Sequence, residues 1–442
     1  MNIRPLRSSI ASALALAVTL GLGPLPAAGE DLMEIYRLAR DNDPTLRAAE
    51  AARLAADEVR PQARASAVLP TVNLDANLSE TRQHESSSGN DSQPADSLSL
   101  TLTQPILHVD RLARLRQADS RIAQAEAEFQ SARQSLMTRV AERYFDVLAA
   151  IDNLEFARAQ KSAIARQLEQ ATKRFEVGLI AITDVHEAQA SYDLASADEI
   201  VAHDALASAR EALAEITGQF HETLASLRRE LKLTSPEPTD ADRWTTTALA
   251  QNLAILAAEQ AVITAREEIE ARRGGHYPTL DLTAAYNHSD NDGALSGFDR
   301  SETTTMALQF NLPLYTGGAT QSQVREASQL YNQAREQLET ARRAARRQAR
   351  DAYRGVIAAI SRVEALKQAL VSTESALEAT EAGFEVGTRT IVDVLNSQRD
   401  LHQARRDYAR ARYDYLLNTL RLKQAAGTIE EGDLETVNRW LQ

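Results

Sequence analysis

The chain has 442 residues, a formal net charge of −13 and no cysteine. The missing cysteines exclude a disulfide framework, a cysteine nucleophile and a lipid anchor attached through cysteine. The acidic balance argues against general nucleic-acid binding.

The first 29 residues have the composition of a secretory signal peptide. Arg4 and Arg7 precede a short apolar run over 10–22, prolines interrupt the chain after it, and small residues stand just before Glu30. The apolar run is too short to span a bilayer as a helix. We expect an exported protein whose mature chain begins at Glu30, with no other segment that could form a transmembrane helix.

Three sequence blocks occur twice in the same order, which indicates an internal duplication. The pairs are LPTVNL at 69–74 with YPTLDL at 277–282, SLTLTQPIL at 99–107 with ALQFNLPLY at 307–315, and FEVGLIAITDV at 175–185 with FEVGTRTIVDV at 384–394. Their offsets are 208, 208 and 209 residues. We therefore expect the following segments: a first repeat over 30–218, an equatorial connector over 219–243, a second repeat over 244–427 and a C-terminal equatorial segment over 428–442.

Each repeat contains two segments in which apolar and polar residues alternate. They span about 70–80 and 97–106 in the first repeat, and about 278–288 and 303–314 in the second. A period of two predicts β-strands with one apolar and one polar face. The stretches between the paired strands, 80–96 and 288–299, are polar and are typical of hairpin loops in water.

The segments that follow the strands are predicted to form unusually long helices. No glycine or proline occurs over 106–177, and a helix of ~70 residues extends on the order of 100 Å. Leu115, Ile122 and Phe129 recur every seven residues, with an alanine three residues after each. This heptad pattern favours left-handed coiled-coil packing at close range.

Four amphipathic strands pose a structural problem, because an open sheet leaves unpaired backbone groups at its edges. In lipid each such group costs on the order of several kcal/mol, and four strands are too few to close a membrane barrel. One solution is a soluble sheet packed on helices. The other is assembly, in which three chains would form a twelve-stranded barrel with an aqueous lumen. The pattern favours assembly but does not fix the number three.

The sequence strongly resembles the TolC family of outer-membrane channels over nearly the whole mature chain. The matching segments are EDLMEIYRLARDNDP at 30–44, ATKRFEVGLIAITDVHEAQASYD at 171–193, HYPTLDLTA at 276–284, LPLYTGGATQSQV at 312–324 and EAGFEVGTRTIVDVL at 381–395. The resemblance implies a mainly α fold with a β-barrel: a homotrimer with a twelve-stranded outer-membrane barrel, a long periplasmic α-helical barrel and a mixed α/β equatorial belt.

The resemblance also implies a function and partners. The chain would be a channel-tunnel in the outer membrane of a Gram-negative bacterium, with its helical barrel in the periplasm. It would form the exit duct for drug efflux or type I protein secretion. Periplasmic adaptor proteins and inner-membrane efflux pumps or ABC exporters would recruit it.

Residues around the two FEVG blocks take their expected roles from the same resemblance. The blocks would be the periplasmic tips, and their adaptor-docking residues would be Val177, Gly178, Leu179, Val386, Gly387 and Thr388. Thr183 and Asp184 would bond to Arg389 and hold the tunnel shut. Asp393 would belong to an acidic ring at the constriction, and Arg412 would be an equatorial residue linked to opening.

Two positions depart from the family pattern, and both lie at the expected gate. Phe384 stands where the family has a latch tyrosine, so one hydroxyl donor is missing. Asn396 stands where the family has a second acidic ring. We therefore expect the family fold, a weakened latch of Thr183, Asp184, Phe384 and Arg389, and one strong selectivity ring instead of two.

An enzyme and a periplasmic coiled-coil adaptor or scaffold are the alternative functions. No Walker loop, His-Glu-x-x-His motif or nucleophile elbow occurs, and the eight histidines show no metal-ligand spacing. We therefore expect no catalytic residue, cofactor or metal. The basic stretch 342–354 lies in an alanine-rich helical pattern, which favours a solvated helix face over a nucleic-acid site. An adaptor would share the export signal and the long helices, but it would not require four amphipathic strands.

Overall fold

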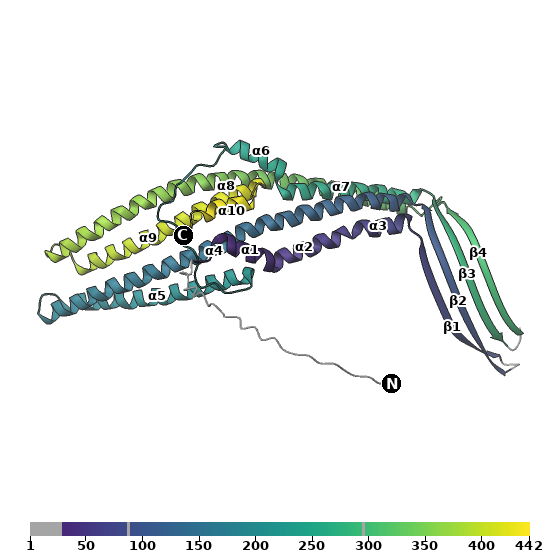
Figure 1. The fold of residues 1–442 in the computed structure, drawn as a ribbon, viewed down its shortest axis with the longest axis horizontal. Helices are drawn as coiled ribbons and strands as arrows, with labels where there is room; N and C mark the ends of the chain where they lie inside the picture. The colour runs from purple at the N-terminus through teal and green to yellow at the C-terminus, as the bar shows by residue number, and fades with distance from the viewer. Residues whose placement is uncertain (1–28, 86–88, 294–296) are drawn as a thin grey trace, which may run out of the picture.

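The computed structural model describes residues 29–85, 89–293 and 297–442, so the expected signal peptide lies outside the described residues except for Gly29. The chain is elongated (Figure 1). A four-stranded sheet lies at one end, and two helix hairpins form the other end. α1, α10 and the C-terminus lie between these ends.

The sheet joins strands from both halves of the chain. It consists of β1 (Thr71–Glu85), β2 (Gly89–Leu107), β3 (Thr279–Gly293) and β4 (Gly297–Asn311). The order is β1-β2-β3-β4, and all neighbours are antiparallel. β1 and β4 are therefore the two edges, and each lacks a partner on its outer side within the chain.

The register places the apolar residues of all four strands on one face. Leu74 lies opposite Leu100, and Leu100 lies opposite Tyr286, while β3 meets β4 at pairs such as Leu282 with Leu308. Because directly opposed residues point to the same side of a sheet, these rows form one apolar face. The alternate rows are polar, and an example is Asp75, Ser99, Asn287 and Thr303.

The strands extend further than the sequence pattern predicted. The polar stretches assigned to loops continue the β-ladder as far as the pairs Glu85 with Gly89 and Gly293 with Gly297. Each strand bonds to its partner through the backbone, so pairing does not require alternating hydrophobicity once the chain has left the apolar zone. The amphipathic pattern marked only the part of each strand that has an apolar face.

Short helices precede each pair of strands. α1 (Leu32–Asn42), α2 (Pro44–Asp57) and α3 (Val59–Val68) lead into β1. α6 (Ala241–Gln251), α7 (Leu253–Arg273) and the 3₁₀ turn η1 (Gly274–His276) lead into β3. By length and composition alone, the described stretch Ala241–His276 passes as a candidate membrane span. The expectation that no segment after the signal peptide would be a candidate transmembrane helix was therefore wrong. In the fold this stretch is interrupted at Asn252, which caps α7, and α7 packs along α4 and α8.

Two long helix hairpins follow the strands. α4 (Val109–Glu176) turns into α5 (Ile182–Thr217), and α8 (Ala319–Glu385) turns into α9 (Ile391–Ala426). α4 has 68 residues and α8 has 67, so each is about 100 Å long. The uninterrupted helix predicted over 106–177 is thus present with nearly those bounds.

The helices stand side by side in a fixed order. α4 packs against α2, α3 and α5 and against α7 and α9, α8 packs against α7 and α9, and α5 makes a smaller direct contact with α9. The column made of α2, α3 and α5 is therefore one edge of the chain, and α8 is the opposite edge. This order continues that of the sheet, because α3 leads into β1 and β4 leads into α8.

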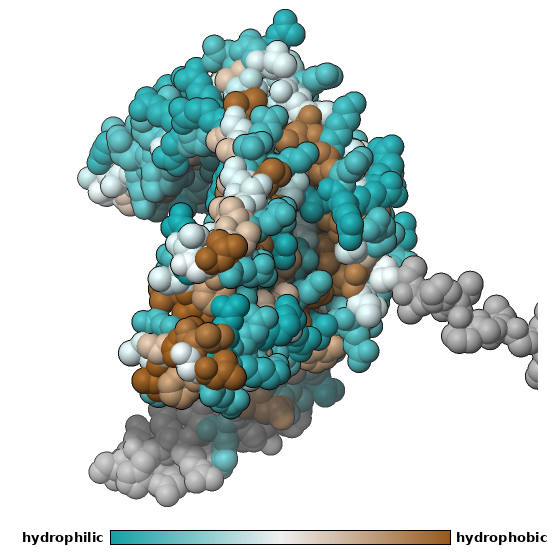
Figure 2. All heavy atoms as spheres, turned by 90° about the vertical axis from the view of Figure 1, so that its left-hand side faces the viewer, coloured by the Kyte–Doolittle hydropathy of each residue, from teal (hydrophilic) through white to brown (hydrophobic). Residues whose placement is uncertain are grey.

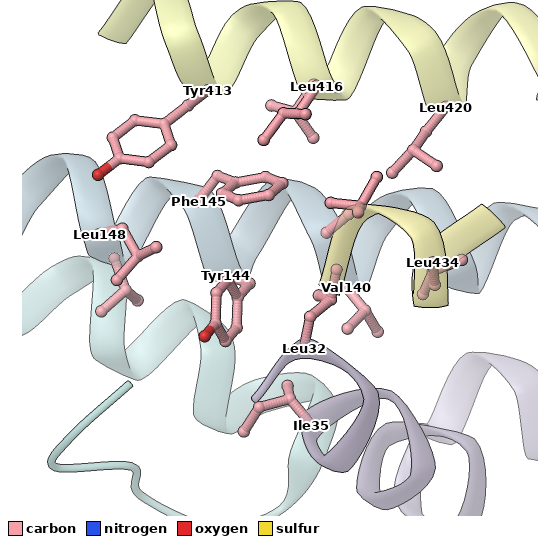
Figure 3. Close-up of a cluster of buried hydrophobic side chains, with 14 of the residues drawn as sticks. Leu32, Ile35, Val140, Tyr144, Phe145, Leu148, Tyr413, Leu416, Leu420 and Leu434 are labelled. Carbon is pink, nitrogen blue, oxygen red and sulfur yellow. The ribbon is translucent and has the colours of Figure 1, made fainter. Parts of the chain in front are cut away.

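The larger of two apolar clusters among the described residues involves the middle of α4, and Figure 3 shows part of it. Phe145 of α4 stacks on Tyr413 of α9, with ring centroids 5.5 Å apart. α1 and α10 (Glu431–Asn438) add buried side chains such as Leu32 and Leu434. The Tyr144 hydroxyl donates to the carbonyl oxygens of Glu30 and Ala225, which ties the segment before α1 to the segment between α5 and α6.

Candidate gate and docking site

The two turns between the long helices lie where the FEVG blocks predicted them. Val177 caps the end of α4, and Gly178 follows with φ of 79°. Val386 caps the end of α8, and Gly387 follows with φ of 80°. This left-handed backbone favours glycine and allows each helix to reverse direction over a few residues.

The tips present apolar side chains to solvent. Val177, Leu179 and Val386 are 69%, 73% and 76% exposed, although each is a residue that normally gains free energy from burial. Figure 2 views the molecule from this end and shows hydrophobic patches set in a mainly hydrophilic surface. The six expected docking residues therefore lie at the exposed tips of two neighbouring hairpins, which is a suitable surface for another protein.

The expected latch residues do not meet within one chain. Thr183 and Asp184 lie at the start of α5, on one edge of the chain, while Arg389 lies in the turn between α8 and α9. Neither Asp184 nor Arg389 forms an ion pair among the described residues. α5 and α9 contact each other within the chain, but no hydrogen bond or ion pair joins Asp184 to Arg389 in its described part, which leaves both side chains available to another copy.

Phe384 has a partner that the sequence did not suggest. The Arg174 guanidinium, from the end of α4, lies over the Phe384 ring at 4.6 Å from its centroid. Phe384 also packs against a small buried cluster that includes Ala171, Ala188 and Ile391, so it joins the two hairpins of the chain. The available signal was an asymmetry between the repeats: Lys-Arg precedes the first FEVG block, whereas Ala-Gly precedes the second.

Asp393 stabilises the start of its own helix. Its carboxylate accepts hydrogen bonds from the backbone N–H and the hydroxyl of Thr390, both at 2.9 Å, in a reciprocal capping box. These bonds, with a smaller contribution from the charge of Arg389, lower the pKa of Asp393 from its ordinary value. A ring of three such carboxylates would oppose this effect, because like charges raise one another's pKa.

Asn396 lies one turn beyond Asp393 and is exposed. Its side-chain oxygen accepts a hydrogen bond of 2.8 Å from the Arg399 guanidinium. Arg399 was not among the residues expected at the constriction, and it places a positive charge next to the position of the expected second ring. The constriction expected from Asp393 and Asn396 therefore carries both signs of charge.

Arg412 of α9 contacts the segment that joins α5 to α6. Its guanidinium donates to the carbonyl oxygen of Arg228 and lies over the Tyr408 ring at 5.7 Å from its centroid. The next residue, Tyr413, donates to the Asp152 carboxylate at 2.7 Å. Burial raises the pKa of Asp152 and of Tyr413, and the positive charge of Arg412 partly counteracts both shifts.

No group of three or more His, Cys, Asp or Glu side chains that could hold a metal ion occurs in the described part of the chain. The chain instead has an amphipathic sheet at one end, long helices along its length, and tips with charged and apolar side chains at the other end. This is the architecture of one subunit of an outer-membrane channel with a periplasmic helical tunnel.

Comparisons with known proteins agree with this class. The model of the family described as outer membrane efflux protein matches residues 35–219 and 244–428. The outer membrane protein TolC of Vibrio cholerae is 41% identical over 435 residues, which cover 97% of this chain and 98% of that protein. The alkaline protease secretion protein AprF of Pseudomonas aeruginosa is 30% identical over 92% of this chain and 86% of its own length.

Solved structures share the fold at low sequence identity. The Campylobacter jejuni CmeC outer membrane channel has a TM-score of 0.76 at 17% identity and covers 94% of this chain and 90% of its own. VceC from Vibrio cholerae has a TM-score of 0.73 at 23% identity and covers 90% of this chain and 96% of its own. The chain belongs to the outer membrane efflux protein family, and it is an outer-membrane protein whose helices lie in the periplasm.

Proposed function

We propose that three copies of this chain close into one channel that serves as the exit duct for drug efflux and type I protein secretion. The observation that carries the proposal is the pair of unpaired edges, β1 and β4, on a sheet with one apolar face. Leu74 and Leu78 of β1, and Met306 and Phe310 of β4, are between 63% and 81% exposed. Pairing β4 of one copy with β1 of the next satisfies both edges and turns the apolar faces toward lipid.

The same closure brings the helical edges together. α8 of one copy lies beside the α2, α3 and α5 column of the next, so the tunnel continues the barrel into the periplasm. The polar sheet face, with Asp75, Ser99 and Asn287, then lines an aqueous lumen. Twelve strands follow from three copies of four.

The tips control opening and recruit partners in this proposal. Asp184 and Thr183 of one copy bond to Arg389 of its neighbour and hold the periplasmic end closed. Asp393 lines the constriction, and Arg412 couples the belt to opening. The exposed Val-Gly-Leu and Val-Gly-Thr tips bind a periplasmic adaptor, which joins the duct to an inner-membrane pump or ABC exporter. The relatives named for protease secretion and efflux support both kinds of cargo.

Oligomeric mass in detergent, combined with conductance in planar bilayers, tests the proposal. We expect a trimer that inserts and conducts with a low conductance when closed. A folded monomer that inserts into the membrane would contradict it. The alternative, a periplasmic adaptor or scaffold, predicts recovery in the periplasmic or inner-membrane fraction and no conductance.

A further inference from the structure

The two helical edges of the chain carry opposite charge. α5 contains eight acidic residues and a single arginine. The stretch 342–354 of α8 contains six arginines and a single aspartate. Both charged regions adjoin the connector, because Arg210 of α5 donates to Glu222 and Tyr353 of α8 donates to Thr239. The end of α5 and the middle of α8 are therefore both tied to the segment that joins the two halves of the chain.

The acidic side chains of α5 point away from its own chain. Ala202, Leu206 and Leu213 are buried against α4 and the core. At about 100° per residue, a distinct set of residues lies on the opposite face of the helix. We call this set the acidic edge: Asp204, Glu211 and Glu215. All three residues are exposed, and none forms an ion pair among the described residues.

The arginines of α8 are arranged in the same way. Ala345, Ala349 and Val356 form the buried stripe of this helix. The residues on the opposite face form what we call the arginine edge: Arg343, Arg347 and Arg354. All three are exposed. Arg343 and Arg354 pair only with acids of their own helix, and Arg347 has no ion pair within the described ranges.

The contact between α4 and α9 inside the chain provides a template. Within the chain, α4 is the first helix of its hairpin and meets α9, the second helix of the other hairpin. Between two copies, the first helix α8 would meet the second helix α5 in the same way. In this internal contact the charges have the reverse arrangement. α4 supplies the acids and α9 supplies the arginines, with Arg410 at 2.8 Å from Asp146 and Arg421 at 2.9 Å from Glu142.

We propose that the arginine edge of one copy binds the acidic edge of the next, and that this reversal of charge dictates which edges can meet. An acidic α4 face repels the acidic α5 of another copy, and a basic α8 repels the basic α9. Around the helical tunnel, the first half of a chain therefore cannot take the place of the second half. The α8 edge of each copy can meet only the α5 edge of the next copy. This inference rests on the proposed trimer and gives that trimer a means of ordering its subunits.

Charge reversal in the full-length protein tests the proposal. One variant carries Glu211→Arg with Glu215→Arg, a second carries Arg347→Glu with Arg354→Glu, and a third combines all four changes. The control is Glu187→Arg with Asp198→Arg, which makes the same change of charge on another exposed face of α5. Each protein is extracted with detergent from the whole cell envelope, periplasm included, and the trimer fraction is measured by native mass determination at low and high salt.

We expect either single-edge reversal to lose most of the trimer, and the four-fold variant to recover it. The control should remain trimeric, and high salt should weaken the wild-type trimer because the pairs are exposed. If the single-edge variants remain as trimeric as the wild type, or if the combined variant fails to recover while the control stays trimeric, the edges do not pair. If the wild-type protein itself is not a trimer, the proposed function fails instead.

Discussion

The two helix hairpins of this chain have nearly the same backbone but different chemistry at their tips. Both turns contain Val-Gly with a left-handed glycine, and both second helices have 36 residues. In the second hairpin Thr390 and Asp393 form a capping box, whereas Ala181 offers the first hairpin no side-chain cap. The Asp393 carboxylate therefore caps its own helix, while the equivalent Asp184 carboxylate remains available for another copy.

The two halves of the chain share their strands and long helices but differ at their tips. The strands of the two halves have matching apolar rows, because every part of a membrane barrel faces the same lipid. In the proposed gate the tips differ because two complementary surfaces must meet, and two identical hairpins would present like charges to each other. Equivalent substitutions should therefore have equal effects in the strands and unequal effects at the tips.

The largest effect is expected where the halves are equivalent. Leu282→Arg with Leu308→Arg should block membrane insertion, because an arginine that faces lipid near the midplane costs ~2–4 kcal/mol. The counterparts in the first half, Leu74→Arg with Leu100→Arg, should do the same. Outer-membrane fractionation measures insertion, and Thr305→Arg on the polar face is the control that should still insert. Unequal effects of the two pairs would show that the halves do not face lipid alike.

The next effect should distinguish the two equivalent aspartates. Asp393→Asn keeps an oxygen that can accept from Thr390 but removes the charge, and it should nearly abolish block of the channel by multivalent cations added from the periplasmic side. Asp184→Asn should leave that block intact and raise the conductance. Planar-bilayer recordings measure both quantities. If Asp393→Asn leaves the block unchanged, Asp400 is the next residue to test.

The sequence predicted the two turns of the proposed gate but not the contacts around them. Glycines and the repeat placed both tips, and an uninterrupted run of residues placed α4 to within a few positions. The contact of Arg174 with Phe384 was not predictable, because it joins two helices whose side-by-side packing no local pattern reveals. The capping role of Asp393 was visible in its spacing from Thr390, whereas the strand ends were missed because polar strands pair as well as amphipathic ones.

A moderate effect is expected from the latch between copies. Arg389→Ser removes the only cation in the second turn and should raise single-channel conductance. An exposed pair of this kind contributes roughly 0.2–1 kcal/mol, and three equivalent pairs act together in a trimer. Ile180, the counterpart of Arg389 in the first turn, packs on the buried cluster that includes Ile391, so the matched control is Arg389→Lys, which keeps the cation and should have little effect. Equal conductance in the wild type and the Arg389→Ser variant would count against the latch.

A smaller effect is expected at Asn396. Asn396→Asp adds a second acidic ring and should strengthen cation block, but Arg399 would partly neutralise the new carboxylate. Adding Arg399→Ala should therefore strengthen the block further. A carboxylate is charged above its pKa, so block should disappear as the pH falls. The second ring raises the pKa of Asp393 by repulsion, and loss of block should then begin at higher pH than in the wild type.

The smallest effect concerns the link between the two hairpins of one chain. An exposed cation–π contact contributes ~0.5–1 kcal/mol, so Arg174→Ala should loosen the closed tip slightly and raise its conductance less than Arg389→Ser does. Arg174→Lys keeps a cation over the ring and should lie between Arg174→Ala and the wild type. Phe384→Tyr keeps the ring and restores a hydroxyl, so it should lower the conductance of the closed channel.

Phe384→Ala removes both the ring contact and the packing on Ile391. If Phe384→Ala opens the channel while Arg174→Ala leaves it unchanged, the ring acts through the buried cluster alone. The difference between the hairpins then lies in apolar packing and not in the arginine.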